Sequence, residues 1–135
     1  METNFDFKSS LCTSREQSER LLALGLKKET ADMCWTKMAR ISGTFYVPEL
    51  APINMVSWRH TPAWSLHRLI EMMPKNIAID GDTAYPLQIQ KRSDGKWCVG
   101  YQGWYDCVGD LYDSVIWIYQ LLISEGYLDE FRNKG

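Results

Sequence analysis

The spacing of apolar and polar residues along this 135-residue chain predicts three helices and a short series of strands. Within residues 14–24, 62–73 and 110–125, apolar side chains gather on one face of a helix. Over residues 85–102, apolar and polar residues alternate singly, as they do in strands with one face covered. The pattern therefore predicts an α+β fold: a small antiparallel sheet with a central β-hairpin, packed by about three helices.

The ends of the first helix are marked by capping residues. Thr13 or Ser14 provides a side-chain oxygen for the free amides of the first turn, and Glu16 or Gln17 stands where a capping box needs its second partner. Gly25 suits the left-handed position that follows a helix. This combination predicts that the helix ends just before Gly25.

The second helix carries signals at both ends. Thr61 can cap it, and Pro62 fits the first helical position because its missing N–H would be unpaired there in any case. Pro74 ends the helix, since the residue before a proline is disfavoured in the helical region. In this register Trp64 falls on the polar face. The buried face consists of Leu66, Leu69, Ile70 and Met73.

The third helix begins at Asp110, which caps it, and ends at Gly126. Its apolar residues cover more than one face: Leu111, Tyr112, Val115, Ile116, Trp117, Ile118, Tyr119, Leu121, Leu122 and Ile123. A helix this apolar either lies at the centre of a core or packs against another copy of the chain. We therefore expect an unknown protein partner, or self-association through helix 110–125.

The hairpin over residues 85–102 contains Asp94 and Gly95, which favour a two-residue turn. That turn would mix polar and apolar side chains on both faces of the hairpin. A loop of three residues instead sets Lys91 opposite Trp97, with the apolar residues of both strands on one face. Because a slip of one residue reverses every side chain, we predict the longer loop, with Gly95 left-handed in a bulge.

The remaining segments are less regular. Residues 30–47 fit either a helical turn or strands, and the sequence does not decide between them. Two prolines predict an irregular loop over residues 48–60, which is either a lid or simply mobile. Residues 1–12 are expected to form a flexible arm and residues 129–135 a frayed tail, on a single domain that spans residues 1–135.

Composition narrows the class of protein. The chain is 45% apolar and 24% charged, which is ordinary for a globular domain, and its net charge of −2 argues against a general polyanion binder. The N-terminus shows no apolar signal segment, and the longest apolar run, within residues 115–123, is far shorter than the ~20 residues that span a bilayer. We therefore expect a cytoplasmic protein that does not enter a membrane.

The sequence shows no motif for a metal, a cofactor or a catalytic group. The four cysteines, Cys12, Cys34, Cys98 and Cys107, include no CxxC pair. We expect them to be reduced and mostly buried, with a shared metal site or disulfides as the alternatives. The glycines form no phosphate-binding motif. We accordingly expect no metal, no cofactor and no enzymatic activity.

One group of side chains suggests a binding site. It straddles the end of the 48–60 loop and the start of the second helix, and it consists of Trp58, Arg59, His60, Trp64, His67 and Arg68. Arginine beside tryptophan offers a positive charge and a stacking face for a nucleotide, a nucleic-acid strand or an acidic peptide. The alternative, which we favour, is that the two tryptophans fold the loop onto the domain while the charged side chains face water.

Three stretches carry a resemblance to a known group of proteins: residues 18–35 (SERLLALGLKKETADMCW), 62–74 (PAWSLHRLIEMMP) and 112–128 (YDSVIWIYQLLISEGYL). The chain resembles a family of small uncharacterised proteins of prophages and mobile elements in Bacteroides-like gut bacteria. The resemblance implies a bacterial or phage cytosolic setting and no particular activity. We therefore expect a non-enzymatic accessory or interaction protein, with nucleic-acid or anion binding at residues 58–68 as the alternative.

Overall fold

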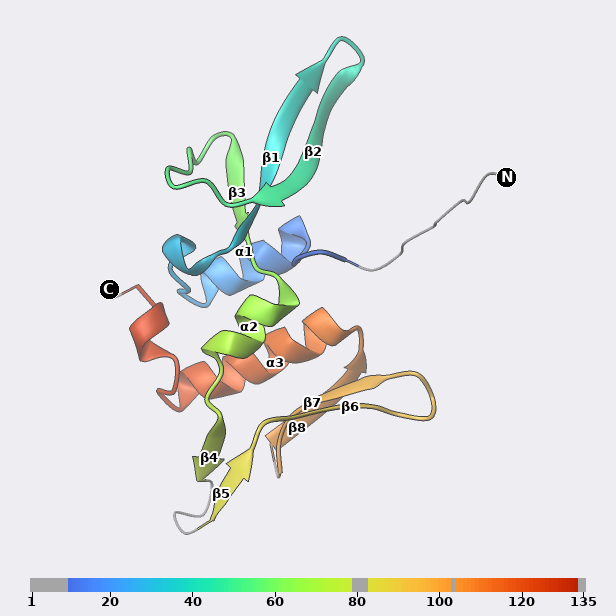
Figure 1. The fold of residues 1–135 in the computed structure, drawn as a ribbon, viewed down its shortest axis with the longest axis vertical. Helices are drawn as coiled ribbons and strands as arrows, with labels where there is room; N and C mark the ends of the chain where they lie inside the picture. Colours follow the sequence, from blue (N-terminus) through green and yellow to red (C-terminus); the bar gives the residue numbers. More distant parts are fainter. Residues whose placement is uncertain (1–9, 79–82, 103, 134–135) are drawn as a thin grey trace.

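The computed structural model describes residues 10–78, 83–102 and 104–133, and Figure 1 shows how they are arranged. These residues form three α-helices and two short 3₁₀ helices. The α-helices are α1 (Arg15–Ala23), α2 (Leu66–Met72) and α3 (Leu111–Ser124), and the 3₁₀ helices are η1 (Lys28–Thr30) and η2 (Asp129–Phe131).

The strands of these residues fall into three small antiparallel sheets, with the orders β2-β1-β3, β4-β5 and β6-β7-β8. Their bounds are β1 (Met33–Arg40), β2 (Gly43–Leu50), β3 (His60–Ala63), β4 (Asn76–Ala78), β5 (Ala84–Pro86), β6 (Gln88–Lys91), β7 (Trp97–Tyr101) and β8 (Trp104–Gly109). The predicted α+β class, with antiparallel strands, a hairpin and three helices, is confirmed. The strands are shared among several sheets, a division that the sequence did not indicate.

Helix α3 lies at the centre of the fold, with α2 beside it and the strands β7 and β8 packed against it (Figure 1). Val115, Ile118 and Leu122 of α3 are fully buried. Tyr119 is buried as well, which raises the pKa of its hydroxyl, and this hydroxyl donates a hydrogen bond to the carbonyl of Leu69. Most of the apolar surface that suggested contact with another copy is therefore buried within the chain itself.

Helix α1 begins and ends as the sequence predicts. The Ser14 hydroxyl accepts a hydrogen bond from the Gln17 N–H at 3.1 Å, and the Gln17 side-chain carbonyl accepts one from the Ser14 N–H at 2.9 Å. Gly25 has a φ of 96°, and the N–H groups of Gly25 and Leu26 donate back into the last turn of the helix. Leu26 is fully buried, which supplies the apolar contact of this type of helix ending.

Helix α2 starts later than predicted. Thr61 and Pro62 lie in β3, which pairs with β1, and they are not the cap and the first residue of the helix. Ser65 is the cap: its hydroxyl accepts a hydrogen bond from the Arg68 N–H at 3.1 Å. The carboxylate of Asp32 accepts hydrogen bonds from both the N–H and the hydroxyl of Ser65. The prediction was wrong because pairing with a distant strand outweighs a local capping signal. The helix does end before its proline, as predicted.

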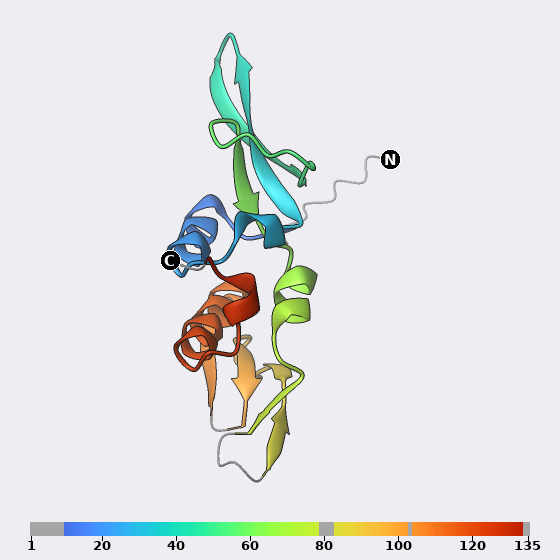
Figure 2. The same cartoon turned by 90° about the vertical axis from the view of Figure 1, so that its left-hand side faces the viewer.

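Residues 33–50 form a long hairpin after the turn of η1. Strands β1 and β2 pair along all eight residues of each strand. Pro48 lies within β2, so the prediction of an irregular segment starting at this residue was wrong, and the loop is instead residues 51–59. Because β2 is an edge strand, a proline there costs no hydrogen bond of the sheet. Figure 2 shows this hairpin extending well beyond the neighbouring strand β3.

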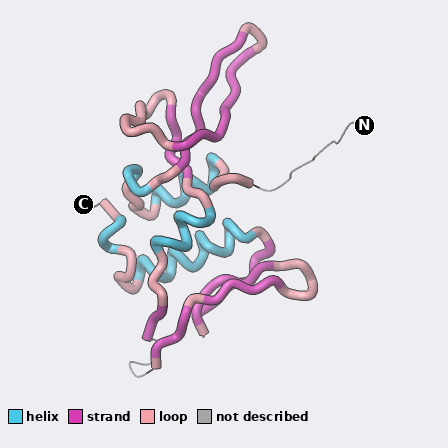
Figure 3. The backbone as a smooth tube through the Cα atoms, viewed as in Figure 1, coloured by secondary structure: helices cyan, strands magenta, loops and turns pink. Residues whose placement is uncertain are grey.

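The hairpin between β6 and β7 has the predicted register, with Lys91 opposite Trp97. The N–H of Gly95 donates to the carbonyl of Arg92 at 2.9 Å, and Gly95 has a φ of 88°. These features confirm the three-residue loop with a left-handed glycine. Figure 3 shows strand β8 returning beside β7 before the chain enters α3.

Cys98 and Cys107 form a disulfide between β7 and β8. The expectation of reduced thiols was wrong for this pair, because a separation of nine residues lets antiparallel neighbours bring their Cα atoms to 4.2 Å. Cys12 and Cys34 are buried free thiols, as expected. Burial, reinforced by the charge of Asp32, raises the pKa of Cys12 to about 11, so this thiol is protonated at neutral pH and unreactive.

The C-terminal segment is tied to α1 as far as Asn133. The N–H of Lys27 donates to the carbonyl of Phe131 at 2.8 Å, and the N–H of Asn133 donates to the carbonyl of Gly25 at 2.7 Å. The prediction of a frayed tail was therefore wrong for this part, because backbone pairing with the end of α1 fixes it. The last two residues of the predicted tail, and residues 1–9 of the predicted arm, lie outside the described residues.

Candidate interaction surface

The six residues predicted as a binding patch are distributed over several elements. Trp58 and Arg59 lie in the 51–59 loop, His60 begins β3, Trp64 joins β3 to α2, and His67 and Arg68 lie on α2. Trp64 is fully buried, and its indole N–H donates to the hydroxyl of Thr30 at 2.9 Å. Placing Trp64 on a polar helix face was wrong, because the helix begins only after this residue and its register does not apply.

Arg68 is occupied inside the protein. Its Nε–H donates to the carbonyl of Thr30 at 2.8 Å, and its guanidinium forms an ion pair with Glu71. His67 is exposed and lies 3.8 Å from the same carboxylate. These contacts make Arg68 a link between α2 and η1, so its charge is already balanced before any ligand arrives.

The loop residues of the patch do face solvent. Trp58 is 73% exposed and Arg59 is exposed beside it. His60 is partly buried, and its Nδ1 accepts a hydrogen bond from the N–H of Val56 at 3.0 Å. The favoured expectation, that both tryptophans fold onto the domain, is therefore confirmed for Trp64 and wrong for Trp58.

Exposed large apolar side chains are frequent in the part of the sequence that contains this tryptophan. Among the described residues nine such side chains are exposed, and five of them lie between residues 41 and 58. These five are Ile41 at the tip of the β1–β2 hairpin, and Leu50, Ile53, Val56 and Trp58 after β2. Ile53, Val56 and Trp58 all lie in the 51–59 loop, and exposed apolar side chains gathered in one segment are typical of a contact site for another molecule.

The topology of the first sheet explains this exposure. Strand β3 pairs only with Met33–Thr36, so the outer half of the β1–β2 hairpin extends as a two-stranded ribbon. A two-stranded ribbon has no core of its own. Side-chain contacts support it instead: the guanidinium of Arg15 lies 3.6 Å from the ring centre of Tyr46, and that of Arg40 lies 4.7 Å from the ring centre of Phe45.

The hairpin and the loop after it also carry basic side chains. Lys37, Arg40 and Arg59 are exposed, with Lys37 and Arg40 on opposite faces of β1 because side chains alternate along a strand. Glu49 is the acidic residue between positions 37 and 59, and its carboxylate accepts a hydrogen bond from the Thr36 hydroxyl at 2.9 Å. We name this region the hairpin surface, which consists of Lys37, Arg40, Ile41, Leu50, Ile53, Trp58 and Arg59.

The 51–59 loop is anchored at both ends and has two hollows beside it. The N–H of Ala51 donates to the carbonyl of Asp32 at 3.0 Å, and the N–H of Lys37 donates to the carbonyl of Arg59 at 2.8 Å. Between these anchors, Met55 lines two open hollows of about 500 and 330 Å³. The loop is thus a supported segment with room beside it for side chains of a binding partner.

A second exposed surface lies on the C-terminal half of α3. Trp117 is 38% exposed, and its i, i+4 spacing places the partly buried Leu121 on the same face. The acidic side chains at this end are Glu125, Asp129 and Glu130, against the base Arg132, which lies 3.9 Å from the Asp129 carboxylate. We name this region the helix surface, which consists of Trp117, Leu121, Glu125, Tyr127 and Asp129.

Exposed surfaces are the clearest functional features of the described residues. Within the described residues, no group of three or more His, Cys, Asp or Glu side chains is placed to hold a metal ion. No helix in these residues is both long enough and apolar enough to cross a membrane. No family model, curated protein or solved structure matches the chain. A function must therefore be proposed from the α+β fold and its exposed surfaces.

Sequence reasoning missed most of the hairpin surface. Phe45 and Tyr46 indicate a strand, but no nearby residue indicates that the hairpin extends beyond β3, the third strand of its sheet. One signal was present: Ile41 stands between Arg40 and Ser42, two residues before Gly43, which is a turn-like setting for a large apolar residue. An apolar residue at a turn is a reasonable marker of an exposed contact.

Proposed function

We propose that this protein is a non-enzymatic interaction protein that assembles with further copies of itself, the hairpin surface of one copy binding the helix surface of the next. One observation supports the proposal: both surfaces combine exposed large apolar side chains with charge, and the charges are opposite. Complementary potentials guide association and fix its register. The self-association expected through helix 110–125 thus becomes a contact between two different surfaces.

This arrangement has a geometric consequence. A contact between two different surfaces leaves the bound pair with one free helix surface on one copy and one free hairpin surface on the other, so growth continues as a ring or a filament. Ile41 and Trp58 are suited to be the anchors of the contact, since large exposed side chains at the centre of an interface carry most of its binding energy. A stable contact of this kind buries on the order of 1,000 Å² or more.

Sedimentation velocity tests the proposal directly. At low ionic strength the average mass should rise as protein concentration is raised into the high micromolar range. In about 1 M salt, where the Debye length falls to about 3 Å, the mass should move toward that of the monomer. A parent protein that stays monomeric at high micromolar concentration in low salt contradicts the proposal.

Charge reversals identify the two surfaces. Arg40→Glu with Arg59→Glu makes the hairpin surface acidic, and Glu125→Lys with Asp129→Lys makes the helix surface basic. Each double variant alone should associate about tenfold or more weakly, because like charges then face each other.

An equimolar mixture of the two double variants should regain assembly, since every contact between the two kinds of copy again joins opposite charges. The matched control is Lys75→Glu with Lys91→Glu, which changes net charge as the hairpin variant does, at exposed positions on other elements. It should assemble like the parent protein. Failure of the mixture to recover would show that the two surfaces do not bind each other.

Nucleic-acid or anion binding is a second candidate, favoured by the exposed Trp58 beside Arg59. A base can stack on the indole while arginine side chains neutralise phosphates. Fluorescence anisotropy of a labelled single-stranded oligonucleotide at low salt measures this binding. The double variant of Arg40 and Arg59 should abolish any binding seen, and an unchanged anisotropy with the parent protein would exclude this candidate.

We further propose that the protein acts in the bacterial cytoplasm as an accessory protein of a phage or mobile element. The support is the resemblance carried by residues 18–35, 62–74 and 112–128. Neighbouring genes provide the test. A replication or recombination cassette would favour nucleic-acid binding, whereas structural or lysis genes would favour assembly.

A further inference from the structure

The β6-β7-β8 sheet has one face against α3 and one open face. Val99 and Tyr101 are buried on the inner face, and the residues that alternate with them face outward. A hollow of about 430 Å³ lies on the open face. Its lining includes Gln88, Gln90, Arg92, Cys98, Gln102 and Cys107. Both cysteines of the disulfide therefore line a hollow that is open to solvent.

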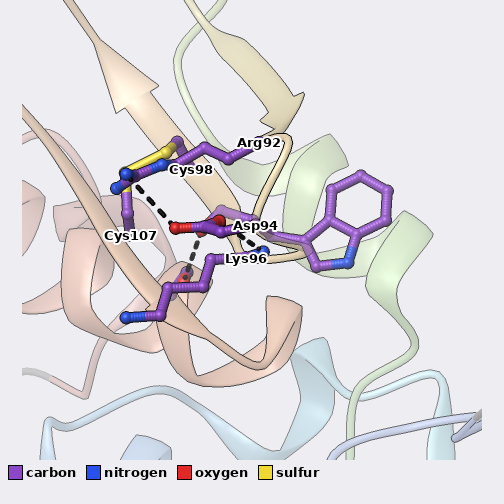
Figure 4. Close-up of a disulfide and its surroundings, with 7 residues drawn as sticks. Arg92, Asp94, Lys96, Cys98 and Cys107 are labelled. Carbon is purple, nitrogen blue, oxygen red and sulfur yellow. Dashed lines mark hydrogen bonds and ion pairs between the residues drawn. A yellow bond between two sulfur atoms is a disulfide. The ribbon is translucent and has the colours of Figure 1, made fainter.

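One arginine lies in the hollow of this disulfide. Arg92 lines the same hollow as the two cysteines, and Lys96 follows in the hairpin loop. Figure 4 shows the Arg92 side chain extending over the same side of the sheet as the disulfide. The ion pair of Arg92 with Asp94, at 3.2 Å, joins two side chains that are about half exposed, at 53% and 43%. A guanidinium beside a cysteine favours the thiolate over the thiol.

The disulfide joins strands that the sheet already holds together. Strands β7 and β8 pair on both sides of it, with Trp97 opposite Gly109 and Val99 opposite Asp106. Helix α3 packs on both strands. Opening the disulfide therefore leaves the backbone pairing and the helix packing in place, so reduction does not require unfolding.

We infer that Cys98–Cys107 is a redox-active disulfide that exchanges with a dithiol, and this function does not depend on the proposed assembly. A thiolate of the dithiol attacks one sulfur of the disulfide, forming a mixed disulfide and releasing the other cysteine as a thiolate beside Arg92. The second thiol of the dithiol then displaces the remaining cysteine. The dithiol leaves as a disulfide, and two electrons and two protons end on Cys98 and Cys107.

The other side chains of the hollow suit a docking dithiol. The amides of Gln88, Gln90 and Gln102 offer both donors and acceptors at its wall. The two remaining cysteines differ from this pair, since Cys12 and Cys34 are buried free thiols. The chain thus separates one exposed sulfur pair from two protected thiols.

Reduction of the full-length protein by dithiothreitol tests the inference. The protein is incubated under native conditions, trapped by alkylation at intervals, and weighed by mass spectrometry, while far-ultraviolet circular dichroism follows the fold. The parent should be fully reduced without loss of the dichroism signal. Arg92→Gln should slow reduction about threefold, because the leaving thiolate loses its cation. Reduction that proceeds only together with loss of the fold would overturn the inference.

The matched control is Lys91→Gln, which removes the same charge one residue away. The Lys91 ammonium lies 5.6 Å from the ring centre of Trp97 and does not line the hollow. It should react like the parent. In the reduced proteins, the pH midpoint for alkylation of Cys98 and Cys107 should rise in Arg92→Gln and stay unchanged in Lys91→Gln. Equal rates and equal midpoints in all three proteins would overturn the inference.

A variant without the disulfide separates a redox role from a structural one. Cys98→Ser with Cys107→Ser should keep the dichroism spectrum of the parent and should associate as the parent does in sedimentation. A double variant that does not fold would show that the disulfide is structural and would overturn the inference. Loss of assembly in the hairpin variants, by contrast, has no bearing on the rate of reduction, so the two proposals fail independently.

Discussion

Replacing Trp64 with alanine tests whether the junction of β3 and α2 belongs to the core. The sequence pattern placed this tryptophan on a polar helix face, whereas the structure buries it completely. Its indole N–H donates to the Thr30 hydroxyl, and that hydroxyl donates in turn to the carbonyl of Lys27 at 2.6 Å. The side chain thus connects the helix junction with η1 and with the packed interior.

The expected magnitude follows from these contacts. Truncating a fully buried aromatic side chain costs about 3–5 kcal/mol, because transfer energy is lost and a cavity remains. The Thr30 hydroxyl keeps its bond to Lys27, so the lost hydrogen bond adds little. We expect Trp64→Ala to lower the free energy of unfolding by about 4 kcal/mol, which corresponds to a fall in Tm of about 15 °C. Trp64→Phe keeps most of the volume and should cost less.

Urea unfolding followed by circular dichroism measures the difference, with the slope of the transition checked for constancy. The matched control is Trp58→Ala, since Trp58 is 73% exposed and should change stability by no more than about 0.5 kcal/mol. Equal losses in the two variants, or a loss below about 1 kcal/mol in Trp64→Ala, would refute the placement of Trp64 in the core.

Three further predictions concern single features of the fold. Asp32→Ala should lower the free energy of unfolding by about 1–3 kcal/mol in thermal melts, because the N–H and hydroxyl of Ser65 lose their acceptor. Gly95→Ala should cost about 1–2 kcal/mol in urea titrations, since a φ of 88° is unfavourable for any residue with a Cβ. Burial raises the pKa of Cys12 from 9.0 to about 11, so the unfolded chain loses this proton first. The contribution of Cys12 to the free energy of unfolding should therefore be fully present below pH 9.0 and fall toward pH 11, by up to about 1.4 kcal/mol per pH unit. The urea midpoint of Cys12→Ala should fall less over that range than the midpoint of the parent protein.

Local signals predicted the parts of the fold that local interactions decide. The capping box of Ser14 and Gln17 lies within a single turn, so its residues identify it without knowledge of the rest of the chain. The register of the β6–β7 hairpin is similarly local, since alternation over a few residues and one glycine select it. Helix α3 was predictable because its cap, Asp110, and its apolar length agree with each other.

Long-range pairing explains what the sequence did not reveal. Thr61 and Pro62 look like the start of a helix until β1 pairs with them, and only the assembled sheet makes Ser65 the cap. The same pairing moves Trp64 from the predicted binding patch into the core. The exposure of Ile41 depends on where β3 stops along β1, and the disulfide depends on β8 returning beside β7. None of these features has a signature within one short stretch.

The tip of the hairpin surface can be altered to test the proposed assembly without changing the stability of the fold. Ile41 lies at the tip of a ribbon that extends past β3, and 110% of its reference area is exposed, so its side chain contributes nothing to the core. Substituting it with aspartate should leave the free energy of unfolding within about 0.5 kcal/mol of the parent. The helix surface differs, because Trp117 projects from the same helix that carries the buried Val115 and Ile118. Substitution of Ile41 therefore reports recognition alone, whereas changes on α3 report recognition and packing together, and the Ile41 variant is the decisive one.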